Sequence, residues 1–361
     1  MATQQATGAV EAPPPFQFKL ITPYSTRING EAAPVPYVID GLLTQSGFSV
    51  LAARPKQGKS SISRYAAVCV AKGVPFLGRQ TTLGEAILIS LEDPSFHVDN
   101  CLEALGYVQG TDAPIHIIEK LSHNTDENFD RLAELLAKMP DVRLVVVDTL
   151  AKLIRVTDLN DYMPVMTGVE RLRNLARLFP KLHVQALAHC KKVRTDDVFD
   201  GLLGSTALRG EPDTNIVLYE QDRKRIIATE TRIGRNLADT IINADLVDIA
   251  GAQVVANFSL GQSLDDYQSL KSEAQDIKQK LSYEQKIIDF LKSSDGLTAP
   301  LEFVIRNLTG RKENLRTAVA TLEAAGVVSF TGKKQSPTDP LKVTLDPEAA
   351  RINEFLSRFA G

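Results

Sequence analysis

Residues 48–73 have the sequence FSVLAARPKQGKSSISRYAAVCVAKG, in which an apolar run is followed by a short polar loop and a helical pattern. The run 48–53 has the nearly unbroken apolar composition of a strand that is buried on both faces of a sheet. The helical pattern places apolar residues on one helix face at Ile62, Ala66 and Val70. A strand, a loop and a helix in this order begin a β–α–β unit.

The same alternation of apolar runs and helical stretches continues over residues 36–260. The further runs are 86–91, 114–119, 143–148, 183–189 and 215–220. The central runs are almost wholly apolar instead of alternating, which is typical of parallel strands that are covered by helices on both sides. We therefore predict an α/β fold with a mostly parallel, doubly wound sheet and right-handed crossovers.

The length of 361 residues, at about 150 residues per domain, predicts about two domains. We predict four segments along the chain. They are an N-terminal tail at 1–35, the α/β domain at 36–260, a polar helical linker at 261–281 and a small C-terminal domain at 282–361.

The composition excludes several classes of protein. The 41 basic and 44 acidic residues give a formal net charge of -3, so the chain is not a histone-like polycation. Three widely spaced cysteines (Cys69, Cys101 and Cys190) predict neither a disulfide framework nor a CxxC metal site. No apolar run reaches the ~18 residues of a membrane span, and the N-terminus lacks the pattern of a secretory signal. We expect a cytoplasmic protein with reduced thiols and no membrane partner.

The loop at residues 53–61 fits the phosphate-loop motif G-x-x-x-x-G-K-[ST], except that Ala53 replaces the first glycine. In this motif backbone N–H groups surround a phosphate at a helix N-terminus, and Gly58 lets the backbone approach the phosphate closely. Lys59 is predicted to contact the β- and γ-phosphates and Ser60 to ligate Mg²⁺, which makes ATP and Mg²⁺ the expected ligands. The alternative is a chance match, and Ala53 fits only with a negative φ. The predicted nucleotide-contacting residues are Ala53, Arg54, Pro55, Lys56, Gln57, Gly58, Lys59, Ser60 and Ser61.

Three polar side chains stand at the ends of predicted strands, where the crevice of a doubly wound sheet lies. Asp148 can hold Mg²⁺ together with Ser60, although a helix cap is the alternative. Glu92 can orient the attacking water as a general base, or belong to an acidic helix start. His189 can sense the γ-phosphate, and its alternative is a histidine with ordinary hydrogen bonds at a strand end.

Two arginines, Arg232 and Arg235, lie on or just after a predicted strand within 226–236. Either one can reach the γ-phosphate of a neighbouring subunit as a trans arginine finger. A solvated surface charge is the equally open alternative for both. The candidate catalytic residues are therefore Lys59, Glu92, His189, Arg232 and Arg235.

Six segments follow one another in the order ARPKQGKS, ILISLEDP, LVVVDTL, LAHCKK, GSTALRGEPDT and TRIGRN. In this order they resemble the motifs of RecA-like hexameric ATPases over about residues 36–258. The resemblance is closest to the AAA_25 or RepA-like group of plasmid and mobile-element helicases, which are related to the DnaB replicative helicases. Each motif alone is moderately specific, whereas their ordered combination is strongly so.

This resemblance implies a RecA-like core, ATP hydrolysis between the subunits of a homo-oligomeric ring, expected to be a hexamer, and movement along single-stranded DNA. It gives Lys59 and Ser60 the Walker A roles, Asp148 the Walker B role, Glu92 the role of base and His189 that of sensor. DnaB-type proteins place a Lys-x-Arg pair near the trans finger, whereas this chain has Glu230-Thr231-Arg232. The DNA-facing loops would follow the Asp148 and His189 strands, with the candidates Lys152, Arg155, Lys191, Lys192 and Arg194.

The C-terminal segment predicts three helices, at 283–293, 300–310 and from 311 on, followed by two strands and a basic hairpin up to 345. Three helices and a β-hairpin are the pattern of a winged helix-turn-helix, whose third helix enters a major groove. Residues 300–345 carry seven basic and four acidic side chains, a net charge of +3 that favours phosphate binding. Docking to a protein partner or another subunit is the alternative. The DNA-binding candidates here are Arg311, Lys312, Asn314, Arg316, Lys333 and Lys334.

Three hypotheses about function follow. The first is a ring-forming, ATP-driven helicase or translocase on single-stranded DNA, in replication of a plasmid, phage or mobile element. The second is an ATP-gated DNA-binding regulator or loader, which uses the winged helix on duplex DNA without processive unwinding. The third is a nucleotide-binding scaffold without hydrolysis, for which Ala53 is the support.

Overall fold

The computed structural model describes residues 34–159, 161–189, 198–203, 206–332 and 340–351. The chain divides into two compact units. The first comprises residues up to Glu220 together with Ala228–Leu237 and Ala244–Ser259. The second comprises Gln221–Ile227, Ala238–Asn243 and the residues from Leu260 on.

A nine-stranded sheet has the order β11-β10-β9-β8-β3-β7-β6-β4-β5. All pairs from β8 to β5 are parallel. These six strands coincide with the six predicted apolar runs and confirm the mostly parallel α/β sheet, within which every residue of β3 and β6 is buried. The strands are β3 (Gly47–Ala53), β4 (Glu85–Ser90), β5 (Ile115–Ile118), β6 (Val142–Asp148), β7 (His183–His189) and β8 (Thr214–Gln221).

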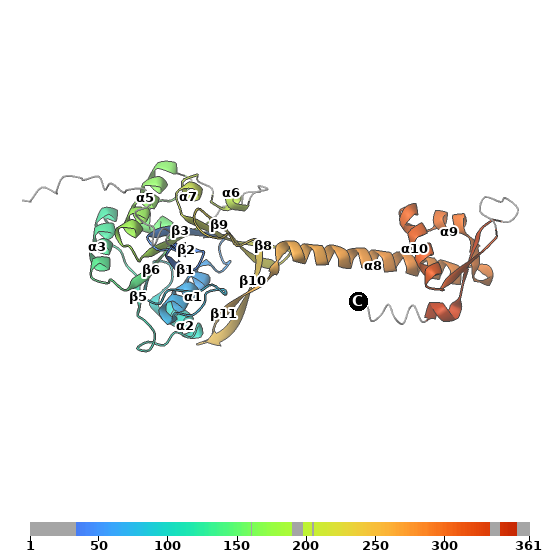
Figure 1. Ribbon diagram of the computed structural model, residues 1–361, viewed down its shortest axis with the longest axis horizontal. Helices are drawn as coiled ribbons and strands as arrows, with labels where there is room; N and C mark the ends of the chain where they lie inside the picture. Colours follow the sequence, from blue (N-terminus) through green and yellow to red (C-terminus); the bar gives the residue numbers. More distant parts are fainter. Residues whose placement is uncertain (1–33, 160, 190–197, 204–205, 333–339, 352–361) are drawn as a thin grey trace, which may run out of the picture. The chain divides into compact units, whose positions relative to one another are not determined.

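Helices cover both faces of this sheet (Figure 1). Phe48 and Val50 of β3 belong to an apolar core that also contains residues of α3 and α5. Since side chains alternate along a strand, Ser49 and Leu51 face the opposite side, where α1 packs. The helices are α1 (Lys59–Lys72), α2 (Ser95–Ala104), α3 (Thr125–Ala137), α4 (Leu150–Ile154), α5 (Tyr162–Leu178), α6 (Val198–Leu203) and α7 (Thr206–Gly210).

Three further strands at the other end of the sheet order are β9 (Lys224–Thr231), β10 (Thr240–Ile249) and β11 (Ala252–Ser263), of which β9 and β10 pair antiparallel. A two-residue turn at Ala250 and Gly251, with φ of 52° and 77°, joins β10 to β11. Positive φ at both turn positions matches the twist of a hairpin. The β10–β11 hairpin is absent from the sequence-based prediction. A small separate sheet pairs β1 (Tyr37–Ile39) with β2 (Leu43–Thr44).

The C-terminal part of the second unit has its own apolar core, to which Ile287, Val304, Leu315 and Val343 contribute. The stretch expected to be a linker and the first predicted helix of this part form one continuous helix, α8 (Leu264–Lys292). The remaining elements are η1 (Asp295–Leu297), β12 (Thr298–Pro300), α9 (Leu301–Asn307), α10 (Lys312–Ala324), β13 (Val328–Thr331) and β14 (Lys342–Leu345). The three strands form a sheet of order β12-β14-β13. Within the described residues, no helix combines the length and the apolar character that crossing a membrane requires.

Candidate functional site

The loop between β3 and α1 has the geometry of an anion-binding turn. Lys56 and Gly58 both have positive φ, of 64° and 91°, and Gly58 is the N-cap of α1 without a side-chain cap. A left-handed turn at the start of a helix directs backbone N–H groups toward one point, where the helix dipole also favours an anion. Ala53 is the last residue of β3 and is not among the residues with positive φ, so its β-carbon causes no strain. The loop thus fits a phosphate group.

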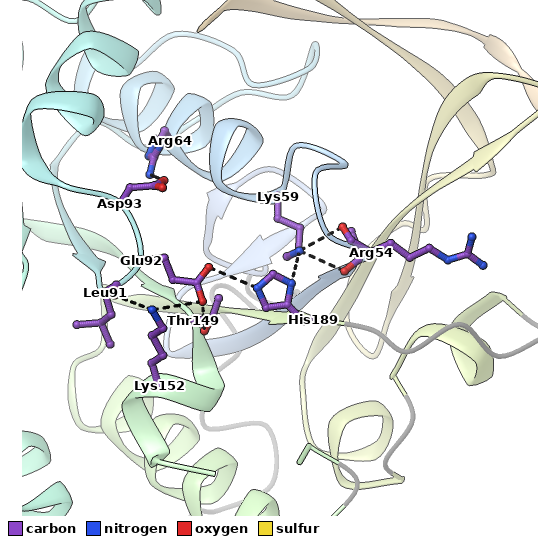
Figure 2. Close-up of polar contacts among 10 residues, drawn as sticks. Arg54, Lys59, Arg64, Leu91, Glu92, Asp93, Thr149, Lys152 and His189 are labelled. Atoms are coloured by element: carbon purple, nitrogen blue, oxygen red, sulfur yellow. Dashed lines mark hydrogen bonds and ion pairs between the residues drawn. The ribbon is translucent and has the colours of Figure 1, made fainter. Parts of the chain in front are cut away.

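Lys59 is the first residue of α1 and is buried. Its Nζ donates hydrogen bonds to the carbonyl oxygens of Ala53 (3.2 Å) and Arg54 (3.4 Å), and it lies 3.1 Å from Nδ1 of His189 (Figure 2). His189 is the register partner of Ala53 in the β3–β7 pair, which explains why these residues meet. Since an ammonium group can only donate, we assign the His189 proton to Nε2 in this arrangement.

Asp148 ends β6 and is buried beside Ser60 of α1, to which it hydrogen-bonds. Its Oδ1 has no hydrogen-bond partner among the described residues. Burial raises the pKa of the Asp148 carboxyl, while the hydrogen bond to Ser60 and the positive charge of Arg64 oppose the rise. Ser60, Arg64 and Asp148 line one small cavity together with Ser90. A hydroxyl and a buried carboxylate with an unsatisfied oxygen are suitable ligands for Mg²⁺.

Glu92 follows the end of β4, whose last residue, Ser90, is the register partner of Asp148. One carboxylate oxygen accepts a hydrogen bond from Oγ1 of Thr149 at 3.3 Å and lies 3.8 Å from Nζ of Lys152 (Figure 2). The other lies 3.5 Å from Nε2 of His189. The structure therefore brings Lys59, Ser60, Glu92, Asp148 and His189 together at the carboxyl ends of four strands.

Arg64 was not selected from the sequence, although it is almost fully buried behind Asp148. It forms an ion pair with Asp93 at 2.5 Å and donates to Sγ of Cys101 at 3.5 Å. The positive charge next to two carboxylates balances a site that would otherwise concentrate negative charge. Its position one turn after Ser60, on the face of α1 that packs on the sheet, is the signal that could have identified it.

The two finger candidates lie outside this cluster, in the turn that follows β9. Arg232 donates from its guanidinium to the carbonyl oxygen of Gly210 at 2.6 Å. The Arg235 backbone N–H donates to the carbonyl oxygen of Gly41 at 3.1 Å, while its side chain is exposed. The neighbouring Gly234 has φ of 135°, and a β-carbon there would lie 2.6 Å from the same Gly41 oxygen.

The predicted DNA-binding residues are only partly described. Lys152 and Arg155 lie on α4 and its C-cap, where Lys152 contacts Leu91 and Glu92 and Arg155 donates to Ser122. The residues Arg311, Lys312, Asn314 and Arg316 lie on α10 or at its N-cap. The side chains of Arg311, Lys312 and Arg316 are exposed, and Arg316 pairs with Glu302 at 2.9 Å. Lys191, Lys192, Arg194, Lys333 and Lys334 lie outside the described residues, as does the tail up to residue 33.

A protein-family model described as AAA_25, an AAA domain, matches residues 12–195, which is just over half of the chain. The chain belongs to the AAA_25 family. This confirms the family that the ordered motifs predict, whereas the RepA-type relation within it stays a prediction. Membership places the AAA_25 chain among the P-loop ATPases, which use a nucleoside triphosphate and Mg²⁺.

Two solved structures are similar to this AAA_25 chain. A KaiC-like protein from the archaeon Pyrococcus horikoshii OT3 has 13% sequence identity and a TM-score of 0.41, covering 62% of this chain and 99% of its own. A DnaB-like replicative helicase, studied for its interactions with primase, has 17% identity and a TM-score of 0.45, covering 63% of each chain. The comparison with curated proteins found no match.

Proposed function

We propose that the AAA_25 chain hydrolyses ATP and uses it to move along single-stranded DNA as a ring-forming helicase or translocase. The observation that carries the hydrolytic part is the convergence of Lys59, Ser60, Glu92, Asp148 and His189 around the phosphate loop. Mobile-element replication, the hexameric ring and the DNA contacts rest on the resemblance of the ordered motifs to DnaB-related ATPases.

The roles of the residues follow from their chemistry. The loop N–H groups and Lys59 bind the triphosphate, with Lys59 leaving the carbonyls of Ala53 and Arg54 for the β- and γ-phosphate oxygens. Ser60 and Asp148 would hold Mg²⁺, which supplies positive charge to the phosphates when bound. Glu92 orients the attacking water and accepts its proton, and His189 lies between this base and Lys59.

The C-terminal elements support a winged helix-turn-helix. The helices α9 and α10 and the strands β13 and β14 occur in the expected order, and α10 presents Arg311 and Lys312 to solvent. In this proposal α10 is the recognition helix on duplex DNA. The ion pair between Arg316 and Glu302 makes Arg316 the weakest of its predicted DNA contacts.

The second candidate, an ATP-gated DNA-binding regulator or loader, is favoured by one observation. Where DnaB-type proteins place the lysine of their Lys-x-Arg pair, this chain has Glu230, which pairs with Arg209 through two contacts of 3.0 and 3.2 Å. The position is thus occupied by an acidic side chain held within its own subunit. A ring without the lysine of this pair has one fewer positive charge to stabilise the nucleotide phosphates that the neighbouring subunit binds.

A strand-displacement assay on forked DNA with ATP and Mg²⁺ tests the first proposal, and hydrolysis is measured in the same samples. Unwinding in either polarity supports the helicase. Hydrolysis without unwinding, stimulated by duplex but not single-stranded DNA, supports the regulator. A wild-type chain without measurable hydrolysis would refute both and leave a nucleotide-binding scaffold. Mass measurement with and without ATP–Mg²⁺ and single-stranded DNA tests the ring.

A further inference from the structure

We propose that Lys152 is a positioning residue that restrains Glu92 and releases it when its ammonium group binds a phosphate of single-stranded DNA. The inference rests on the proposed ATPase function and adds a regulation of the same site. It makes one side chain the link between the segment after β6, which the ordered motifs predict to face DNA, and the general base.

Lys152 connects the ends of two neighbouring strands. It lies on α4, which begins two residues after Asp148. Its Nζ donates to the carbonyl oxygen of Leu91 at 3.0 Å and lies 3.8 Å from Oε1 of Glu92. The backbone N–H of Leu91 in turn donates to the carbonyl oxygen of Asp148 at 2.8 Å. Lys152 therefore holds both the backbone before Glu92 and the Glu92 carboxylate.

The carboxylate of Glu92 is engaged on both oxygens. Oε1 faces Thr149 and Lys152, and Oε2 faces His189. A general base needs an oxygen lone pair that is directed at the attacking water within hydrogen-bond distance. Each partner that Glu92 keeps uses one of about four lone-pair positions of the carboxylate. Removing the Lys152 contact frees one of these positions and lets the side chain turn.

A DNA phosphate can compete for Lys152. The Lys152 side chain is 48% exposed, so its ammonium group is accessible from solvent. The phosphate oxygen of a nucleic acid is the same kind of anionic acceptor as the Glu92 carboxylate, and exposed lysine–carboxylate pairs are weak. The ammonium group has three donors, so it can keep its bond to Leu91 while it exchanges Glu92 for the phosphate.

Steady-state hydrolysis by the full chain is the first test, with and without a dT oligonucleotide. In Lys152→Met the basal kcat rises about two- to fivefold, which corresponds to the free energy of an exposed ion pair. The KM for ATP is unchanged, and the oligonucleotide no longer stimulates hydrolysis. Lys152→Arg, which keeps the positive charge, partly restores the restraint: its basal kcat lies closer to wild type than that of Lys152→Met, and the oligonucleotide again stimulates hydrolysis. Lys138→Met, which removes an exposed lysine of the same ATPase unit, is the matched control and behaves as wild type. A Lys152→Met chain with wild-type or lower basal kcat overturns the proposal.

Oligonucleotide binding without nucleotide is the second test, and it does not depend on hydrolysis. Because Glu92→Gln removes the competing charge, it tightens binding of a fluorescent dT oligonucleotide about two- to fivefold by anisotropy. In the Lys152→Met background the same substitution has no effect, which a double-mutant cycle measures. An equal gain in both backgrounds, or no gain in either, overturns the inference. Absence of hydrolysis in the wild type instead refutes the proposed function and leaves the binding cycle to decide on Lys152.

Discussion

Lowering the pH from 7 to 5 is expected to destabilise the ATPase unit through one buried histidine. His183 begins β7 and is completely buried. Nδ1 donates to the carbonyl oxygen of Thr44 at 2.7 Å, and Nε2 accepts from the Ser49 hydroxyl at 2.8 Å. Burial lowers the pKa of His183 from 6.5 to about 4, although the Thr44 contact and the charge of Asp213 act in the opposite direction.

The sign follows from the protons bound in each state. Between pH 6.5 and 4 the unfolded chain carries a proton on His183 that the folded chain lacks, so the free energy of unfolding falls as the pH falls. With these two pKa values the loss is about 2 kcal/mol between pH 7 and pH 5. Its full size of about 3 kcal/mol is reached only below pH 4.

Urea unfolding at several pH values, followed through the transition of the ATPase unit, measures this loss. His183→Gln is less stable than wild type at pH 7, because it disturbs two buried hydrogen bonds. Between pH 7 and pH 5, however, its free energy of unfolding falls by about 2 kcal/mol less than that of the wild type. His123→Gln, which replaces an exposed histidine of the same unit, is the matched control. Parallel slopes for wild type and His183→Gln would refute the reasoning.

Three further substitutions test the site. Lys59→Ala is expected to lower kcat for ATP hydrolysis at least 10²- to 10³-fold, the effect of removing one preorganised donor, while thermal unfolding shows an intact fold. Arg235→Ala lowers the rate of ATP hydrolysis at least tenfold, and mixing these chains with Lys59→Ala chains restores hydrolysis if Arg235 acts in trans. Arg232→Ala mainly lowers the melting temperature, because the Arg232 guanidinium hydrogen-bonds within its own subunit. Gly234→Ala lowers the free energy of unfolding by about 1–3 kcal/mol, because the new β-carbon would meet the Gly41 carbonyl and the backbone keeps a positive φ; an unchanged denaturation midpoint contradicts this.

The central sheet could be predicted because burial on both faces leaves a strong signal in the sequence. The four residues 144–147 inside the run 143–148 are leucine and valine only, and the phosphate loop has a nearly fixed spacing. Asp148, Glu92 and His189 could then be placed near each other, because parallel strands end at the same edge of a sheet. Their individual hydrogen bonds depend on register and could not be predicted.

The β10–β11 hairpin was missed for a physical reason. Its turn has Ala250 at a position with positive φ, whereas the recognisable hairpin turns carry asparagine, aspartate or glycine there. Two neighbouring apolar residues of β10, Leu246 and Val247, are also exposed, so the alternation of polar and apolar residues that marks a half-buried strand is weak.

The contact between Lys152 and Glu92 was missed because it joins residues 60 positions apart. From the sequence, a lysine near a predicted DNA-facing loop is indistinguishable from one that holds a catalytic side chain. The continuous helix α8 was divided in two by its composition, since its polar part up to about residue 281 and its amphipathic part after it differ in burial but not in backbone structure. The amino-acid composition of a helix thus indicates how far each part of it is buried, but not where the helix ends.

The buried Oδ1 of Asp148 affects what a laboratory screen for more stable variants of this ATPase would select. A buried carboxylate oxygen without a hydrogen-bond partner among the described residues carries a desolvation cost that a neutral or apolar side chain at position 148 would lower. Screening variants for heat resistance alone would therefore enrich replacements of Asp148 that have lost the proposed metal ligand. Stabilised versions of this enzyme have to be selected with ATP turnover as a second criterion.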